Sequence, residues 1–152
     1  MIRLYTDGAA QGNPGPGGYG AILRFEGHEK ELSQGYRLTT NNRMELMAVI
    51  AGLSAIKKLG IPVTIYSDSK YVVEAVKQGW IWGWEKTDFK KKANPDLWKR
   101  YILLHKKFKP EFVWIRGHNG HQENERCDQL AVSAAQGYDL EVDVGYEESK
   151  AN

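Results

Sequence analysis

Residues 39–48 read TTNNRMELMA, and the hydrophobic pattern of the chain changes within this stretch. Upstream of it, residues 2–7, 17–25 and 30–38 form short strand-like runs, and the first run alternates apolar with polar side chains. Downstream of it, apolar side chains recur at helical spacing. The chain therefore begins with an antiparallel meander of three strands and continues with helices.

The first expected helix begins at Asn42, because Asn42 and Glu45 have the spacing of a capping box. Gly60 and Pro62 end that helix. The later elements are a strand at 63–66, a helix over 69–76 that begins at Ser67 or Ser69, a helix capped by Asn94 with Pro95 in its first turn, a strand at 111–115 and a last helix through Cys127, Leu130, Ala131 and Ala134. This order predicts an α/β fold, a mixed sheet with helices on its faces.

The chain has 152 residues and 41% hydrophobic content, which suits one globular domain with a core of its own. We expect a single domain over 1–137 and an acidic, mobile tail over 138–152. A single cysteine cannot form an internal disulfide, and no run reaches the ~18 apolar residues of a membrane span. These features, together with a beginning that holds no apolar signal stretch, predict a cytoplasmic protein with no membrane partner. We expect a monomer, because no unusually apolar face is evident.

The net charge of +2 hides an uneven distribution. Residues 86–109 contain nine Lys or Arg and two acids, a local balance of +7 that leaves −5 for the remaining chain. Trp80, Trp82 and Trp84 precede this segment, and Lys86 opens it. Exposed aromatic rings beside lysines suit a nucleic-acid backbone, although the same tryptophans also suit the covering of the following helix. Both interpretations remain open from the residues alone.

Four acids occupy positions where the expected elements meet: Asp7, Glu45, Asp68 and Asp128. Each alone has an ordinary structural explanation as a turn residue, a helix cap or a solvent-facing carboxylate. As a group at the carboxyl ends of the strands, they form a set of hard oxygen ligands that suits Mg²⁺ or Mn²⁺. Two such ions about 4 Å apart activate water for in-line attack on a phosphodiester. This interpretation predicts a nucleic-acid substrate.

Two other motifs carry competing interpretations. Residues 15–20 read GPGGYG and match the dinucleotide-binding pattern, but a strand rather than a helix follows them, so we expect no organic cofactor. His118 and His121 lie three residues apart without a third ligand of zinc-like spacing. A loop histidine near carboxylates suits proton transfer, which we assign to His118, whereas His121 is expected to be structural.

The sequence resembles the bacterial type 1 ribonucleases H, the ribonuclease HI family, over nearly the whole chain. The resemblance rests on five segments in the same order, namely Tyr5-Thr6-Asp7-Gly8, GNPGPGGYGA at 12–21, TTNNRMEL at 39–46, Ser67-Asp68-Ser69, and Gly117-His118 with ENERCD at 123–128. It implies the ribonuclease H fold with a five-stranded mixed sheet. It also implies endonucleolytic cleavage of the RNA strand of an RNA/DNA hybrid, with two Mg²⁺ ions, leaving 5′-phosphate and 3′-hydroxyl ends.

The resemblance also implies roles for individual residues. Asp7, Glu45, Asp68 and Asp128 match the catalytic metal ligands, and His118 matches the loop histidine that assists proton transfer or product departure. Glu45 would also contact a ribose 2′-hydroxyl, the group that distinguishes RNA from DNA. The implied hybrid-binding residues are Asn13, Asn41 and Asn42 in the minor groove, Thr40 on a DNA-strand phosphate, and Trp80, Trp82 and Lys86 within the basic protrusion at 80–92.

The sequence departs from this pattern at Lys70, where related bacterial members have a glutamine, and in a shortened, rearranged protrusion over 80–98. Two other functions compete with hybrid cleavage. A DNA-cutting relative such as an integrase or junction resolvase shares the fold and the acids, but the expected groove-reading asparagines disfavour it. A catalytically inactive hybrid-binding module has no use for four mutually repelling carboxylates in one cleft.

Overall fold

The meander at the start of the chain forms as the sequence predicts. In the computed structural model, which describes residues 1–117 and 121–151, β1 (Ile2–Ala10), β2 (Gly15–Phe25) and β3 (His28–Thr39) are its strands. They pair antiparallel in chain order. β4 (Val63–Ser67) adds parallel to the other edge of β1, and β5 (Glu111–Trp114) adds parallel to β4. This arrangement confirms the expected mixed sheet.

The sheet has six strands in the order β5-β4-β1-β2-β3-β6, whereas the resemblance implied five. The additional strand is the two-residue β6 (Leu140–Glu141), which pairs parallel with β3. The predicted strands all form, so the difference lies in the region after Gly137.

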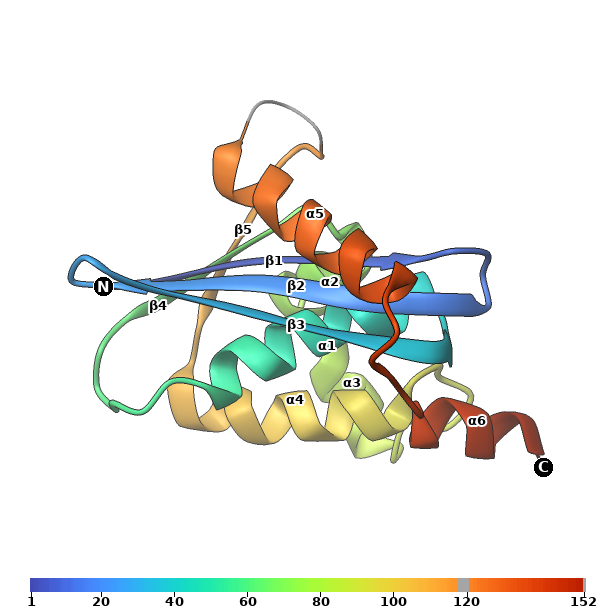
Figure 1. Cartoon of the computed structure of the whole chain (residues 1–152). Helices are drawn as coiled ribbons and strands as arrows, with labels where there is room; N and C mark the ends of the chain where they lie inside the picture. The colour runs from blue at the N-terminus through green and yellow to red at the C-terminus, as the bar shows by residue number, and fades with distance from the viewer. Residues whose placement is uncertain (118–120, 152) are drawn as a thin grey trace.

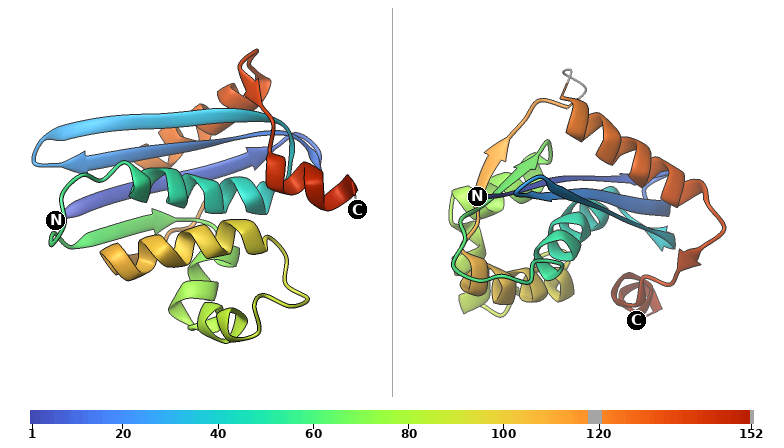
Figure 2. Two further views of the ribbon diagram at one scale, coloured as in Figure 1. Left: turned by 90° about the horizontal axis from the view of Figure 1, so that it is seen from below. Right: turned by 60° about the vertical axis from the view of Figure 1, so that its left-hand side comes forward.

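Helices cover both faces of the sheet (Figures 1 and 2). α1 (Asn41–Ser54) and α4 (Pro95–Phe108) lie on one face, with α2 (Lys70–Lys77) and α3 (Trp80–Lys86) on the same side, and α5 (Gln122–Gln136) lies on the other. The main core lies under α1 and α4, and its fully buried side chains include Leu4, Leu46, Ile65, Trp98 and Tyr101. Among the described residues, no helix has both the length and the apolar character needed to cross a bilayer.

Two helix caps differ from their predictions. Thr40, rather than Asn42, caps α1, because its hydroxyl accepts a hydrogen bond from the Arg43 backbone N–H at 3.3 Å. Asn94 precedes Pro95 as expected, but its backbone is left-handed (φ +60°) and its side chain does not cap α4. Its amide instead donates to the Tyr71 hydroxyl at 3.0 Å. Ser69 caps α2, as one of the two predicted starts requires.

Two glycines allow the helices on opposite faces to approach the sheet very closely. A Cβ at Gly8 of β1 would overlap the backbone nitrogen of Glu45 on α1. A Cβ at Gly20 of β2 would overlap the carbonyl oxygen of Cys127 on α5. Gly20 is the register partner of Asp7, so both contacts lie at the same place in the sheet. The glycine-rich run at 15–20 therefore serves helix packing.

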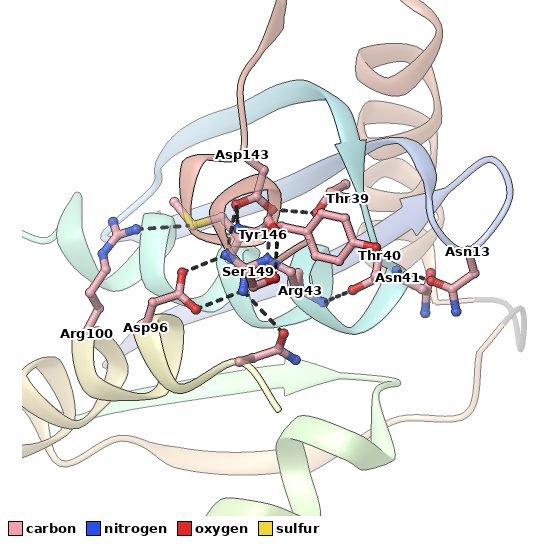
Figure 3. Close-up of polar contacts among 12 residues, drawn as sticks. Asn13, Thr39, Thr40, Asn41, Arg43, Asp96, Arg100, Asp143, Tyr146 and Ser149 are labelled. Carbon is pink, nitrogen blue, oxygen red and sulfur yellow. Dashed lines mark hydrogen bonds and ion pairs between the residues drawn. The ribbon is translucent and has the colours of Figure 1, made fainter. Parts of the chain in front are cut away.

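The segment after Gly137 is the largest departure from the sequence prediction. We expected a mobile tail over 138–152, but the structure places residues 140–151 against the body as β6 and α6 (Val144–Ala151). Asp143 joins the two elements and accepts hydrogen bonds from Thr39 Oγ1 at 2.7 Å and from Arg43 Nε at 2.8 Å (Figure 3). Local composition conceals this contact, because the partners of Asp143 lie about 100 residues earlier.

Arg43 is the centre of this buried network. Its side chain is only 3% exposed and also pairs with Asp96 at the start of α4, at 2.7 Å (Figure 3). Its Nη1 donates to Asn94 Oδ1 at 3.3 Å. A buried guanidinium is stable only when its charge and donors are satisfied. Arg43 thus holds α1, α4 and the C-terminal segment together.

Replacing Asp143 with alanine is expected to lower the free energy of unfolding by about 3 kcal/mol, because the buried Arg43 loses one of its two carboxylates. Urea denaturation followed by circular dichroism measures this loss. The matched control is Asp139→Ala, which removes an exposed carboxylate from the same segment. Equal stability of the two variants would contradict the role given to the network.

Candidate active site

Three carboxylates from different elements converge at one edge of the sheet. Asp7 lies within β1, which continues to Ala10 rather than ending at Asp7 as the sequence indicated. Glu45 lies one turn into α1, and Asp68 directly follows β4. One oxygen from each of the three carboxylates lies within 4.8 Å of the others. The spacing suits oxygen ligands that share a cation.

The Gly8 backbone connects two of these acids. Its N–H donates to Asp7 Oδ1 at 2.9 Å and also to Glu45 Oε1. Asp7 and Glu45 are 7% and 5% exposed. The close approach of α1 to β1 at Gly8 therefore fixes the position of both carboxylates and removes most of their contact with water.

Asp128 reaches the same pocket from the opposite face of the sheet. It lines a pocket of about 440 Å³ together with Asp7, Glu45 and Asp68. The preceding residue, Cys127, is fully buried, and its Sγ donates to the Tyr5 carbonyl at 3.4 Å. This contact and the Gly20 approach place α5 over the strand that carries Asp7. All four predicted acids thus lie around one pocket, although Asp128 is outside the tight cluster of three.

Burial and the neighbouring carboxylates oppose the ionisation of Asp7 and Glu45. Burial, followed by the charges of Asp68 and Asp128, raises the pKa of Asp7 to about 7, although hydrogen bonds from Glu45 and Gly8 oppose the shift. Burial and the neighbouring Asp7 raise the pKa of Glu45 well above its ordinary value. Protons and divalent cations therefore compete for the same oxygens near neutral pH.

Lys70 is the cation that lines the acid pocket within the described part of the chain. Its Nζ lies 5.2 Å from the centre of the Trp114 ring, in a cation–π contact. The Trp114 indole N–H donates to the Asp68 carbonyl oxygen at 3.2 Å. Sequence reasoning missed Trp114, because the strand pattern at 111–115 does not show that β5 pairs with β4 next to Asp68.

The predicted polar binding residues lie beside the acids. The Asn41 backbone N–H donates to Asn13 Oδ1 at 3.2 Å, which joins the β1–β2 turn to the start of α1 (Figure 3). Asn41 and Asn42 line the acid pocket. Asn13, Thr40 and Asn42 line a second pocket, of about 780 Å³. Asn42 belongs to both pockets, so the two are neighbours.

The predicted binding residues of the tryptophan-rich segment, Trp80, Trp82 and Lys86, line neither pocket. Trp82 packs edge-on against His105 at 5.1 Å, and Trp84 packs edge-on against Trp98 at 5.7 Å, which fits the helix-covering alternative. Trp80 is 49% exposed, and Lys86 is exposed as well. Lys92, at the end of the predicted protrusion, does line the second pocket.

Only one of the two loop histidines lies within the described residues. His118, predicted to assist proton transfer, lies outside the described residues. His121 precedes α5 at its N-cap position, and its side chain makes no capping hydrogen bond.

A sequence model of the RNase H family matches residues 1–136, which include all four acids. The chain belongs to the RNase H family. The ribonuclease H of Trichodesmium erythraeum is 55% identical over 153 residues, which cover 96% of both chains. The ribonuclease H of Salmonella paratyphi C is 51% identical and covers 97% of this chain and 96% of its own. The family assignment makes the chain an enzyme of the ribonuclease H type.

Solved RNase H structures share the fold. LC9-RNase H1 has a TM-score of 0.79 and 32% identity over 99% of this chain and 81% of its own. LC11-RNase H1, solved in complex with an RNA/DNA hybrid, has a TM-score of 0.68 and 27% identity over 90% of this chain and 97% of its own. The family assignment therefore rests on sequence and on architecture.

Replacing Asp7 with asparagine is expected to raise the melting temperature of the metal-free enzyme by about 3–8 °C at pH 8. A carboxyl with a higher pKa in the folded than in the unfolded chain binds extra protons on folding. Its ionisation therefore destabilises the fold as the pH rises from about 4 to about 7. The gain should shrink toward pH 4. Calorimetry at both pH values measures it.

The control for this experiment is Asp139→Asn, which neutralises an exposed acid away from the pocket. Its melting temperature should follow that of the unmodified enzyme at both pH values. A melting temperature of Asp7→Asn well below that of the unmodified enzyme would mean that Asp7 has a structural role instead.

Proposed function

We propose that this enzyme cleaves the RNA strand of RNA/DNA hybrids internally, by two-metal-ion catalysis, leaving 5′-phosphate and 3′-hydroxyl ends. The observation that carries the proposal is the convergence of four carboxylates on one pocket, three of them within 4.8 Å of one another. A binding protein gains nothing from such a set of mutually repelling carboxylates, whereas phosphodiester hydrolysis by hard cations requires ligands of this kind. The acids are proposed as the catalytic residues.

The donor set fits Mg²⁺, with Mn²⁺ as a substitute, because all four ligands are carboxylates and no thiolate or imidazole belongs to the described cluster. Asp7, Glu45, Asp68 and Asp128 would hold the ions. Bound there, the ions lower the pKa of the attacking water and stabilise the charge on the leaving oxygen. Glu45 and Asp7 must give up the protons that burial favours, so metal binding should strengthen with rising pH.

The neighbouring polar residues position the substrate. Asn13, Asn41 and Asn42 offer amide donors and acceptors that suit base and sugar edges in a minor groove, and Thr40 offers a hydroxyl to a phosphate. Glu45 is also proposed to accept a hydrogen bond from a ribose 2′-hydroxyl, which would select the RNA strand. The hybrid found with LC11-RNase H1 supports this substrate class. His118 is proposed to assist proton transfer near the pocket.

The test is cleavage of a duplex with one labelled RNA strand and one DNA strand in Mg²⁺, beside RNA/RNA and DNA/DNA duplexes. Internal cuts in the hybrid RNA alone are expected, and Asp7→Asn should remove them, by a factor of about 10³ or more if the acid is required for chemistry. Treatment of the products with phosphatase and re-ligation identifies the ends.

The alternatives predict different results in the same assay. Binding of the hybrid without cleavage would support the binding-module alternative. Cleavage of the DNA duplex would support the DNA-cutting alternative. Either result would overturn the proposal.

Replacing Lys70 with glutamine is expected to change the salt dependence of hybrid binding more than the turnover rate. Lys70 lines the acid pocket, and its ammonium would contact a phosphate of the substrate that binds there. Loss of one phosphate contact should reduce the slope of log Kd against log [KCl] by about 0.9. Fluorescence anisotropy over a range of KCl concentrations measures the slope. An unchanged slope would contradict a phosphate contact.

A further inference from the structure

The second pocket is a groove with two walls, one from the middle of the chain and one from its C-terminal segment. One wall is the loop before α4, with Lys92 and Asn94, and the other is α6, with Tyr146 and Lys150. Asn42 connects the groove to the acid pocket, because it lines both. A substrate bound over the acids can therefore extend into this groove.

The two walls present matching cations. Lys92 Nζ lies 5.3 Å from the centre of the Trp84 ring, and Lys150 Nζ lies 5.5 Å from the centre of the Tyr146 ring. Each ammonium is thus held along an aromatic face instead of extending freely from the surface, which lowers the entropy lost when it contacts a ligand. Tyr146 is itself buried. The ring that Lys150 contacts therefore belongs to the folded body of the protein.

The charges of the groove favour an anion. Five charged residues line it, and two of them, Arg43 and Asp96, pair with each other at 2.7 Å. The other three are Lys92, Lys150 and Glu148, with a balance of +1. Ser149 donates its hydroxyl hydrogen to the Tyr146 carbonyl at 2.6 Å, so Lys150 is the principal donor that α6 offers.

The anchoring of α6 makes this wall firm. Besides the bonds to Thr39 and Arg43, Asp143 accepts the Tyr146 backbone N–H at 3.2 Å. Arg37 on β3 donates twice to Glu147, at 2.8 Å each. The first turn of α6 is thus attached to the same β3–α1 junction that carries Thr40 and Asn42.

From these observations we propose that α6 is a wall of the nucleic-acid site, and that Lys150 contacts a phosphate of the DNA strand of the hybrid. The proposal rests on the proposed function and extends it. A duplex presents two backbones on either side of its minor groove. If the RNA backbone lies over the acids and the amides of Asn41 and Asn42 face the groove between, the second backbone meets Lys92 and Lys150.

The test measures hybrid binding by fluorescence anisotropy in the Asp7→Asn background with Mg²⁺, so that the substrate stays intact. Lys150→Gln is expected to raise Kd about 3–8-fold near 0.1 M KCl and to reduce the salt slope by about 0.9. Glu148→Gln removes a repelling charge from the same wall and should lower Kd about twofold. The matched control is Lys57→Gln, an exposed lysine beyond the far end of α1, which should leave both quantities unchanged.

Neutral methylphosphonates, placed one at a time, identify the strand. A methylphosphonate at one or two positions in the DNA strand should weaken binding by the protein that retains Lys150. The same methylphosphonates should have no further effect on binding by Lys150→Gln. The proposal is overturned if Lys150→Gln behaves as Lys57→Gln does, or if the sensitive positions lie in the RNA strand. Cleavage of the hybrid by the unmodified enzyme separates the two hypotheses. If the enzyme cuts the hybrid but Lys150→Gln binds it normally, only the Lys150 contact is wrong; if the enzyme does not cut the hybrid, the proposed function is wrong.

Discussion

The site depends on how closely two helices approach the central strands of the sheet. Gly8 lets the backbone of α1 lie directly against β1, and Gly20 lets the backbone of α5 lie directly against β2. Because Asp7 pairs with Gly20 and precedes Gly8, both contacts surround the same carboxylate. They bring Glu45 from one face and Asp128 from the other to the same pocket. The geometry of the acids thus follows from missing Cβ atoms in the sheet.

This packing is maintained against electrostatic repulsion. The buried acids of the pocket have raised pKa values, and their mutual charge opposes the folded state in the absence of a cation. Two residues before Glu45 on α1, Arg43 does the opposite, because it pairs with Asp96 and Asp143 and joins α4 and the C-terminal segment to the helix. One helix therefore carries both a buried carboxylate with a raised pKa and a buried ion-pair network that holds its surroundings in place. Such separation is expected where function and stability conflict.

The sequence predicted the parts of this arrangement that depend on local patterns. The strands and main helices followed from periodicity, and the four acids followed from their places beside those elements. The close packing at Gly20 was hidden, since GPGGYG at 15–20 looks the same whether glycine serves a phosphate or a helix. β6 and α6 were missed, because a polar segment becomes ordered only through Arg43 and Thr39, far away in sequence. The packing of Trp82 and Trp84 was left open, because their partners His105 and Trp98 lie on a different helix.

The measurement that tests the account most directly is Mg²⁺ binding by Gly8→Ala, compared with the unmodified enzyme by calorimetry under conditions where circular dichroism shows both proteins folded. The account predicts that the added methyl group separates α1 from β1, moves Glu45 away from Asp7, and weakens Mg²⁺ binding at least tenfold. A folded Gly8→Ala protein with unchanged Mg²⁺ affinity would show that the close approach at this glycine does not position the acids.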